Sequence, residues 1–583
     1  MMTNLKMIKL KCVLKKTNTL VKGIFLSLCI LISSHTYSQR LELSHFDNYE
    51  VAEVSVDLHN VDIELIALLE GVEIDHGSTK HKANLYITKL GFLNLEKHNI
   101  PLSWSEPHKS NIKMKSLEEY NNEILKSNCL PPMDFYPSYE AYIQMMYDFE
   151  EKYPDLCEII DIGTLSSGRK ILVAHIGDQL GAIEEEPNFL YTSTMHGDEL
   201  AGFPMMLMYI DMLLCNYGTD EKITEAVNNI NIYINPLANP DGTYRGGNQT
   251  VEQAIRFNNQ FVDINRNFPD PREGPNPDGR NHQEETLIFM DFATQYDIHL
   301  SCNIHGGKEV CSYPWDTYIE KHADDEWWID VTRAYADTAH THAPTGYLTF
   351  LNDGITNGYE WYELTGGRQD YMTYFHRGRE FSLEISNQKI LDSDLIPTYW
   401  DYNKSALLNY MCEAQYGLRG KILDCRTGLP LLAEISIPGH DMQNSSVFSS
   451  EADGSYFRFL AEGQYDIMVT AEDYDTLFAN ISIVDKSTVR YDGELCPLGE
   501  VATVDNNVLD LFIYSNKNKI YIQGDNNILN ATLSLYALNG TLIQKSSIVD
   551  MSTGINQSLP SGIYIATIEV DGILDTYKVL ISQ

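Results

Sequence analysis

The chain has 583 residues, of which 43% are hydrophobic and 11% aromatic, and it carries a formal net charge of −40 at pH 7. This length predicts about three or four domains, and the composition is that of a globular protein, which excludes a largely disordered chain. Because nucleic acid needs a basic footprint, the acidic excess argues against a nucleic-acid partner. It would either attract cationic substrates or simply keep the surface of the protein soluble.

Residues 1–38 have the pattern of a signal peptide. They contain six lysines and no acidic residue, followed by the apolar stretch from Gly23 to Ser34. A twelve-residue helix is about 18 Å long, which is too short for a bilayer core of about 30 Å. Small residues at Thr36 and Ser38 place the expected cleavage before Gln39. We therefore expect an exported protein with no transmembrane segment in the mature chain.

Export permits disulfides. Eight of the ten cysteines follow the leader, and none forms a Cys-x-x-Cys pair, so no thiolate zinc site is expected. The sequence does not determine the pairing; Cys425 with Cys496 and Cys302 with Cys311 are two possible pairs.

Residues 39–115 alternate strand-like and helix-like segments and predict a small α/β unit. A polar stretch at 105–116 follows, and we place a linker at 116–132. Residues 133–415 then predict a large α/β domain, a mixed sheet flanked by helices. Its clearest elements are the buried strands 188–194, 229–237 and 298–305 and the helix 200–214, which is apolar nearly all round.

After Tyr416 the chain changes to short alternating strands broken by glycine turns. This pattern predicts two all-β sandwich domains, at 416–497 and 504–583. The second contains hairpin signals at Asn539-Gly540 and Asp571-Gly572.

A candidate metal site begins directly after the strand 188–194. His196 and Glu199 leave its end in the segment TMHGDEL, although His-x-x-Glu pairs also occur by chance. A zinc ion with an open catalytic position usually takes three His or carboxylate ligands. His305, which follows another apolar strand and precedes two glycines, is the expected third ligand.

This set resembles the zinc metallocarboxypeptidase family, whose ligands follow His-x-x-Glu and a distant His after a strand. The spacing of the third ligand suits its N/E (regulatory) subfamily. The segment FVDINRNFPDP resembles a second family signature. The resemblance implies that Asn265 and Arg266 hold the substrate's terminal carboxylate, as a planar guanidinium does well, and that Arg256 stabilises the oxyanion.

Two further residues carry roles implied by the resemblance. Glu384, in the strand-like segment REFSLEISNQK, stands where the family has its catalytic glutamate, because a carboxylate beside the metal can accept a proton from water and pass it to the leaving amine. Tyr362 matches the mobile tyrosine that closes over bound peptide.

Substrate specificity is implied by two more positions. Asp316 in the YPWD segment and Gln369 match residues of subfamily members that remove C-terminal Lys or Arg, and a buried carboxylate would pair with a cationic side chain. Two residues depart from the family pattern: relatives commonly have Asn at Asp198 and an apolar residue at Arg368. Arg368 lies beside Gln369 and could oppose a cationic substrate.

The flanking domains also show resemblances. The sandwich 416–497 resembles the transthyretin-like module of the same subfamily. The segment 504–583 resembles the type A C-terminal sorting domain of the type IX secretion system, which implies secretion machinery as a partner and a secreted or outer-membrane surface location. The unit 39–115 is either an inhibitory propeptide or a permanent docking domain.

The sequence therefore predicts a secreted carboxypeptidase with one zinc ion, acting on peptide or protein C-termini and releasing Lys or Arg. A peptidoglycan stem-peptide hydrolase is an alternative within enzymes. A catalytically inactive cell-surface binding protein is the alternative outside them.

Overall fold

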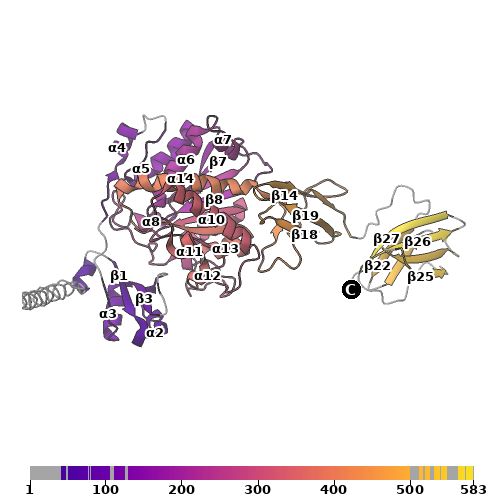
Figure 1. Ribbon diagram of the computed structural model, residues 1–583, viewed down its shortest axis with the longest axis horizontal. Helices are drawn as coiled ribbons and strands as arrows, with labels where there is room; N and C mark the ends of the chain where they lie inside the picture. The colour runs from indigo at the N-terminus through magenta and orange to yellow at the C-terminus, as the bar shows by residue number, and fades with distance from the viewer. Residues whose placement is uncertain are drawn as a thin grey trace, which may run out of the picture. The chain divides into compact units, whose positions relative to one another are not determined.

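The structure is a computed structural model (Figure 1). The residues that it describes are 41–47, 50–75, 78, 81–104, 110–124, 129–498, 511–516, 519–524, 531–538, 540–547, 562–570 and 573–581. They divide into two compact units, one with residues up to 180 and 186–414, the other with 181–185 and the chain from 415. The predicted signal peptide lies outside the described residues.

The centre of the first unit is a mixed eight-stranded sheet. Across the sheet, its strands are β12 (Ile355–Asn357), β11 (Lys308–Tyr313), β13 (Arg379–Ser386), β10 (Leu300–His305), β8 (Asn188–Ser193), β9 (Asn231–Asn235), β7 (Lys170–Ile176) and β6 (Cys157–Thr164). The four central strands, β13, β10, β8 and β9, run parallel, whereas β11, β7 and β6 each add an antiparallel pairing. The predicted fold class is confirmed.

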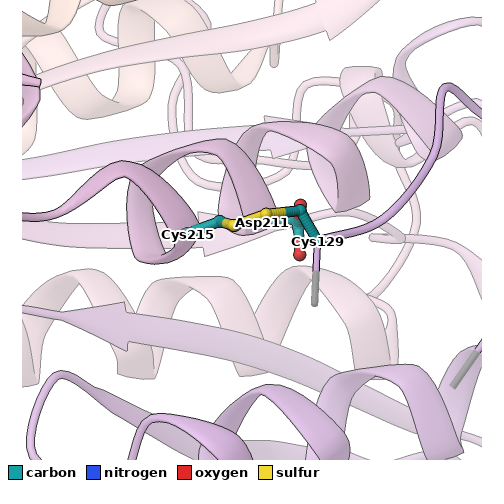
Figure 2. A group of neighbouring side chains, drawn as sticks. All are labelled: Cys129, Asp211 and Cys215. Carbon is teal, nitrogen blue, oxygen red and sulfur yellow. A yellow bond between two sulfur atoms is a disulfide. The ribbon is translucent and has the colours of Figure 1, made fainter. Parts of the chain in front are cut away.

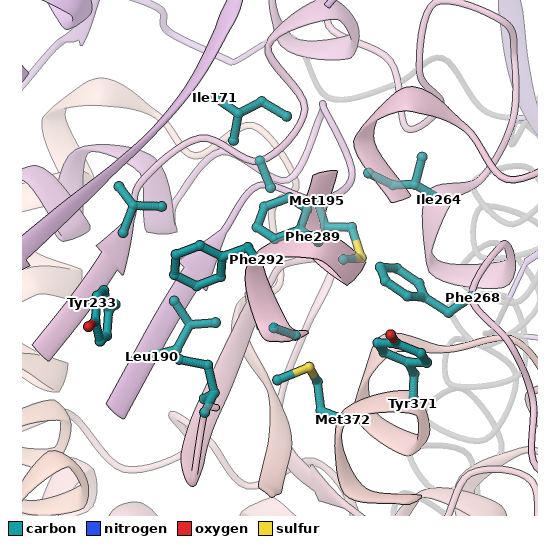
Figure 3. Packing of buried hydrophobic residues seen from close by; sticks show 14 of the residues in the cluster. Ile171, Leu190, Met195, Tyr233, Ile264, Phe268, Phe289, Phe292, Tyr371 and Met372 are labelled. Atoms are coloured by element: carbon teal, nitrogen blue, oxygen red, sulfur yellow. The ribbon is translucent and has the colours of Figure 1, made fainter. Parts of the chain in front are cut away.

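Helices cover both faces of this sheet (Figure 1). One face carries α6 (Gly202–Asn216), α10 (Asp325–His342) and α14 (Ile396–Cys412), and the other carries α9 (Glu284–Tyr296) and α13 (Arg368–Phe375). Successive strand residues point to opposite faces. Tyr191 accordingly donates a hydrogen bond to the Leu407 carbonyl of α14, while its neighbour Leu190 belongs to the same buried apolar cluster as Phe289 and Phe292 of α9 (Figure 3).

The carboxyl ends of three neighbouring parallel strands bring distant segments together. β8 ends just before His196, β10 ends at His305, and β13 contains Glu384 near its end. In the ladder between β10 and β13, His305 and Glu384 are direct partners. Since adjacent strands lie about 4.8 Å apart and partners share a face, this register places both side chains side by side.

The N-terminal part of this unit is a small α/β fold, as predicted. Its antiparallel sheet has the order β1 (Val51–Asp57), β3 (Lys82–Thr88) and β2 (Val72–Ile74), with helices α2 (Ile63–Ala67) and α3 (Lys89–Lys97). It has its own apolar core, which includes Val56, Leu85 and Leu95.

The stretch predicted as a linker, 116–132, contains the short helix α4 (Leu117–Glu119) and the helical segment η3 (Tyr120–Ile124). Strand β4 (Met114–Lys115), just before this stretch, pairs with β5 (Tyr136–Pro137), which follows it. Ser116 and Glu119 form a capping box, a sequence signature of a helix start that the linker prediction overlooked.

Two disulfides join described cysteines. Cys129 is bonded to Cys215 of α6, next to Asp211, whose carboxylate accepts a hydrogen bond from the Leu130 amide (Figure 2). Cys425 is bonded to Cys496, one of the two pairs considered from the sequence. The other pair is wrong, because Cys302 and Cys311 are free, buried thiols inside the central sheet.

The second unit begins with two four-stranded sheets. In the first sheet the strand order is β17 (Ser455–Arg458), β14 (Gly417–Asp424) and β20 (Thr488–Arg490), and β21 (Gly493–Leu495) also pairs with β14. In the second sheet the strand order is β16 (Val447–Phe448), β15 (Glu434–Ser436), β18 (Gly463–Thr470) and β19 (Leu477–Ile483). Ile422, Ile435, Ile467 and Val469 belong to their shared apolar core, as expected for a sandwich.

The described part of the C-terminal segment is also all-β. It contains β22 (Leu511–Asn516) paired with β23 (Lys519–Gly524), and a sheet of β25 (Leu542–Ser547), β24 (Thr532–Ala537), β26 (Gly562–Val570) and β27 (Ile573–Ile581). Of the predicted turn residues, Asn539, Asp571 and Gly572 lie outside the described residues. Within the described ranges, no helix combines the length and apolar character needed to cross a membrane.

Candidate metal centre and active site

The three predicted metal ligands lie together in the structure. His196 and Glu199 belong to the loop after β8, and His305 ends β10; all three are at least 97% buried. Their ligand atoms all lie within 4.8 Å of one another. The parallel pairing of β8 with β10 produces this approach, because both strands end at the same edge of the sheet.

The distances in this group fit a tetrahedral zinc ion. Oε2 of Glu199 lies 2.9 Å from Nδ1 of His196 and 2.9 Å from Nδ1 of His305, and the two Nδ1 atoms are 3.1 Å apart. Ligand atoms about 2.0–2.1 Å from zinc in a tetrahedron are about 3.3 Å from one another. Two imidazoles and one carboxylate are also the donor set of a catalytic zinc site.

Asp263 orients one of these ligands. Its Oδ1 atom lies 3.1 Å from Nε2 of His196. A carboxylate only accepts hydrogen bonds, so Nε2 carries the proton and Nδ1 presents its lone pair to the other two ligands. The Oδ2 atom of Asp263 accepts hydrogen bonds from Nε and Nη2 of Arg256 at 2.9 and 2.8 Å.

Arg256 reaches the same group of side chains. Its Nη1 atom lies 3.2 Å from Oε1 of Glu199 and 3.1 Å from Nδ1 of His196. The guanidinium is 98% buried, and Asp263 and Glu199 together balance its charge. Arg256 is therefore held at the edge of the candidate metal site, where a cation could stabilise developing negative charge.

Glu384 lies beside His305, through the register described above, and is 95% buried. Burial raises the pKa of its carboxyl well above the ordinary value, and the Glu199 charge adds to this effect while Arg256 opposes it. A cation held by His196, Glu199 and His305 would relieve this concentration of buried negative charge.

Asn265 and Arg266 occupy the short helix η4 (Ile264–Arg266), directly after Asp263. The amide N–H of Asn265 donates to Oδ1 of Asp263 at 2.9 Å, so the same carboxylate holds a metal ligand and this segment. The Asn265 side chain accepts a hydrogen bond from the Arg368 amide at 2.9 Å. Arg266 is partly exposed and donates to the Asn265 carbonyl.

Tyr362 follows the helix α12 (Gly358–Trp361). Burial raises the pKa of its hydroxyl, and the charges of Arg266, Asp316, Glu384 and Arg256 all act on it. The influence of all four charges on the phenol associates Tyr362 with the other predicted site residues.

Asp316 and Gln369, the two predicted specificity residues, are in direct contact. Nε2 of Gln369 donates to Oδ1 of Asp316 at 3.0 Å, and Oε1 of Gln369 accepts the Ser382 amide at 2.8 Å. Because Ser382 provides an N–H, the amide orientation is determined, and Asp316 must be the acceptor. Burial raises the pKa of Asp316 to about 7.

Arg368, which could oppose a cation near Gln369 according to the sequence, is paired with an acidic side chain. Its guanidinium is 99% buried and makes two hydrogen bonds, of 3.0 and 2.7 Å, to the Glu380 carboxylate on β13. Ser301 donates a further hydrogen bond to Glu380. The charge of Arg368 is therefore neutralised on the side of the helix facing the sheet.

Two of these residues, Asp263 and Glu380, had no role predicted from the sequence. Asp263 lies in the quoted segment FVDINRNFPDP, which was the available signal for it. Glu380 offered no signal, because its partner Arg368 is on a different element.

The N-terminal unit also contributes side chains at this location. The Arg256 guanidinium carbon lies 5.4 Å from the ring centroid of Tyr86 on β3, and Tyr86 contacts the Phe257 ring edge-on at 5.7 Å. Lys389 pairs with Glu53 at 2.7 Å and contacts the Tyr86 hydroxyl.

The site has the composition of a hydrolytic zinc site: two buried imidazoles, a carboxylate and a neighbouring glutamate at the ends of parallel strands.

A family model described as zinc carboxypeptidase matches residues 142–406. Mouse carboxypeptidase M is 30% identical over 380 residues, covering 61% of this chain and 82% of the relative. The mouse carboxypeptidase N catalytic chain is 29% identical over 398 residues, covering 62% and 86%.

Mouse carboxypeptidase D is 30% identical over 381 residues, covering 62% of this chain, which spans only 27% of that relative. Among solved structures, carboxypeptidase A from Helicoverpa armigera gives a TM-score of 0.48 at 17% identity, covering 63% of this chain and 97% of that one. The match to carboxypeptidase M, which covers most of that relative, shows that this chain belongs to the zinc carboxypeptidase family. Zinc is the cofactor of this family, and His196, Glu199 and His305 form a group that could hold it.

Proposed function

We propose that this protein hydrolyses the last peptide bond of peptides and proteins and releases a C-terminal Lys or Arg. The observation that carries the proposal is the grouping of Glu384 and Arg256 around the three metal ligands, with Asn265 held by the same Asp263 that orients His196. The three candidate ligands, Arg256 and Asn265 thus belong to one hydrogen-bond network through Asp263 and Glu199, and Glu384 lies beside it as the strand partner of His305.

Glu384 and Arg256 perform the chemistry in this proposal. Zinc with an open coordination position supplies Lewis-acid polarisation and lowers the pKa of water. Glu384 accepts a proton from the water that adds to the scissile carbonyl carbon. It then gives the proton to the amine that leaves as the carbon–nitrogen bond breaks. Arg256 stabilises the oxyanion, and Asp263 keeps its guanidinium in place.

Asn265 and Arg266 restrict cleavage to chain ends. A guanidinium beside an amide binds a free carboxylate through several hydrogen bonds, which an internal peptide bond cannot replace. Tyr362, whose hydroxyl pKa responds to the charges of both arginines and of Glu384, closes over the bound peptide.

The preference for Lys or Arg rests on Asp316. Its buried carboxylate accepts from Gln369, and the only nearby basic side chain on α13, Arg368, is neutralised by Glu380. A cationic substrate side chain would add to the attraction that Arg266 already exerts on this carboxylate, whereas an apolar side chain would add none.

The N-terminal unit covers the active site in this proposal, in the manner of an inhibitory propeptide. Burial raises the pKa of Glu73 on β2, the Asp263 charge adds to the rise, and Arg266, Arg280 and Arg256 oppose it. The Asp75 charge acts on both Arg256 and Glu384. These two carboxylates compete with a substrate's terminal carboxylate for the same arginines.

The remaining domains have roles suggested by sequence resemblance. The sandwich 416–497 is a transthyretin-like module that stabilises the enzyme. Residues 1–38 direct export, and residues 504–583 act as a type IX sorting domain that engages the secretion machinery and leads to a secreted or surface location.

The proposal is tested with peptides that differ only in the last residue, assayed with and without a chelator, together with muropeptides from peptidoglycan stems. Chelator-sensitive release of terminal Arg or Lys is expected. Exclusive cleavage of muropeptides would instead identify a stem-peptide hydrolase. Zinc binding with no turnover of any substrate would identify a binding protein.

A further inference from the structure

Three loops meet beside the metal centre, and one buried carboxylate contacts all of them. We define the carboxylate loop as residues 263–270, the Asp316 loop as residues 315–317, and the glycine loop as residues 366–369. Asp270 ends the first loop and is 98% buried.

Asp270 makes more hydrogen bonds than its own turn requires. Its Oδ1 atom accepts the amide N–H groups of Arg272 and Glu273 at 2.9 and 2.8 Å, which is a local turn. The same atom accepts the Thr317 hydroxyl at 3.2 Å, and Oδ2 accepts the Gly366 amide at 3.0 Å. The last two bonds reach the Asp316 loop and the glycine loop.

The glycine loop has little freedom to move away from Asp270. Gly366 has a φ of 71°, and a Cβ there would lie 2.3 Å from the Arg266 carbonyl oxygen. The Gly366 carbonyl also accepts the Phe268 amide at 3.0 Å. The carboxylate loop and the glycine loop are thus in backbone contact, and Asp270 satisfies the N–H at the centre of that contact.

The residues that follow Gly366 contact both predicted substrate-binding groups. The Arg368 amide donates to Oδ1 of Asn265, and the Gln369 side chain donates to Asp316. Asp370, next in the chain, accepts the amide N–H groups of Asp316 and Thr317. A shift of this loop would therefore move Asn265 and Asp316 together.

We propose that Asp270 is a positioning residue that couples recognition of the substrate's terminal carboxylate to recognition of its cationic side chain. It touches no substrate itself. It holds the carboxylate loop, the Asp316 loop and the glycine loop in one arrangement. The inference rests on the proposed carboxypeptidase function.

The test uses Asp270→Asn in the full chain. Asparagine keeps the shape but places an NH₂ group against either the turn amides or the Gly366 amide, so a donor faces a donor. Peptides ending in Arg and in citrulline, its neutral analogue of equal shape, give two kcat/KM values. Their ratio is expected to fall about tenfold or more, with kcat for the Arg peptide changed about threefold or less.

A second variant separates positioning from folding. Thr317→Val removes only the hydroxyl that joins Asp270 to the Asp316 loop, and a smaller fall of the same ratio is expected. Thr317→Ser restores the hydroxyl and should restore the ratio. Asp424→Asn is the matched control, because Asp424 in the sandwich also accepts two turn amides and one hydroxyl, from Tyr474.

Calorimetric binding of free arginine and free citrulline provides a readout that needs no turnover. An unchanged Arg-to-citrulline ratio in Asp270→Asn, or a loss confined to kcat, would overturn the inference. A wild type that binds both amino acids equally would also overturn it. The wild type could prefer arginine to citrulline in binding, lose this preference in Asp270→Asn, and yet hydrolyse no peptide. That result would refute the proposed activity but support the positioning role of Asp270.

Discussion

Asp263 and His196 are joined by a hydrogen bond of 3.1 Å between Oδ1 and Nε2, and this bond selects the imidazole tautomer that can bind a metal. The other oxygen of the same carboxylate holds Arg256. One side chain thus positions a metal ligand and the residue proposed to stabilise the oxyanion.

The first prediction concerns Asp263→Asn, which lets the imidazole adopt the other tautomer. Loss of such an orienting carboxylate is expected to lower zinc affinity about 10- to 100-fold. Competition with a chromogenic chelator measures the affinity. Asp211→Asn serves as the control, since Asp211 is buried near the Cys129–Cys215 disulfide and accepts a backbone amide; an equal loss in both variants would contradict the role of Asp263.

Removal of the metal is expected to abolish turnover and to lower the melting temperature. Without a cation, Glu199 and Glu384 remain buried near each other, and the metal's binding free energy is lost from the native state. For a metal present at about a thousand times its dissociation constant, the loss is about 4 kcal/mol, or on the order of 10 °C in a domain of this size. Calorimetry before and after chelation, with zinc added back, checks this.

Glu384→Gln is expected to lower kcat by about two to four powers of ten, because the amide cannot accept the proton from water. Zinc content, measured by elemental analysis, should be unchanged, since Glu384 is not a proposed ligand. Retention of normal kcat would remove Glu384 from the mechanism.

Asp316 predicts a pH dependence of specificity. Its pKa of about 7 is raised by burial, so the carboxyl is ionised and attracts a cation above pH 7, and it is protonated and neutral below. The kcat/KM for Arg peptides should therefore fall, relative to citrulline peptides, by about tenfold per pH unit well below pH 7. Asp316→Asn should give a ratio that is low and independent of pH.

If the N-terminal α/β unit inhibits the enzyme, removing its carboxylates near the active site should raise the peptidase activity. The double change Glu73→Gln and Asp75→Asn removes the two carboxylates that act on Arg256, Arg266 and Glu384. Activity toward peptides is expected to rise about tenfold, the effect of about 1.4 kcal/mol of lost attraction. Glu70→Gln, an exposed carboxylate in the same unit, should have no effect. Unchanged activity of the double variant would favour a permanent docking domain.

The buried strands and the metal ligands could be predicted because their signals are local. Apolar runs of the length of β8 and β10, each followed by polar residues and glycine, indicate strand ends in an α/β sheet. The parallel order of these strands then brings His196, Glu199 and His305 to one edge.

The pairings that complete the site could not be predicted, because each joins side chains from separate elements. Arg368 was suspected of repelling a cation, and only the fold shows that Glu380 neutralises it. Likewise, the Cys129–Cys215 disulfide spans 86 residues and has no sequence motif. The contact of Tyr86 with Arg256 depends on packing between the small N-terminal sheet and the large mixed sheet of the same unit, which periodicity does not describe.

The register of β10 against β13 limits where the chain can tolerate insertions and deletions. A one-residue insertion or deletion inside either strand would turn His305 and Glu384 toward opposite faces of the sheet. The number of residues in each of these two strands is therefore constrained by the active site. Surface loops that contact none of these residues can gain or lose residues without disturbing the chemistry.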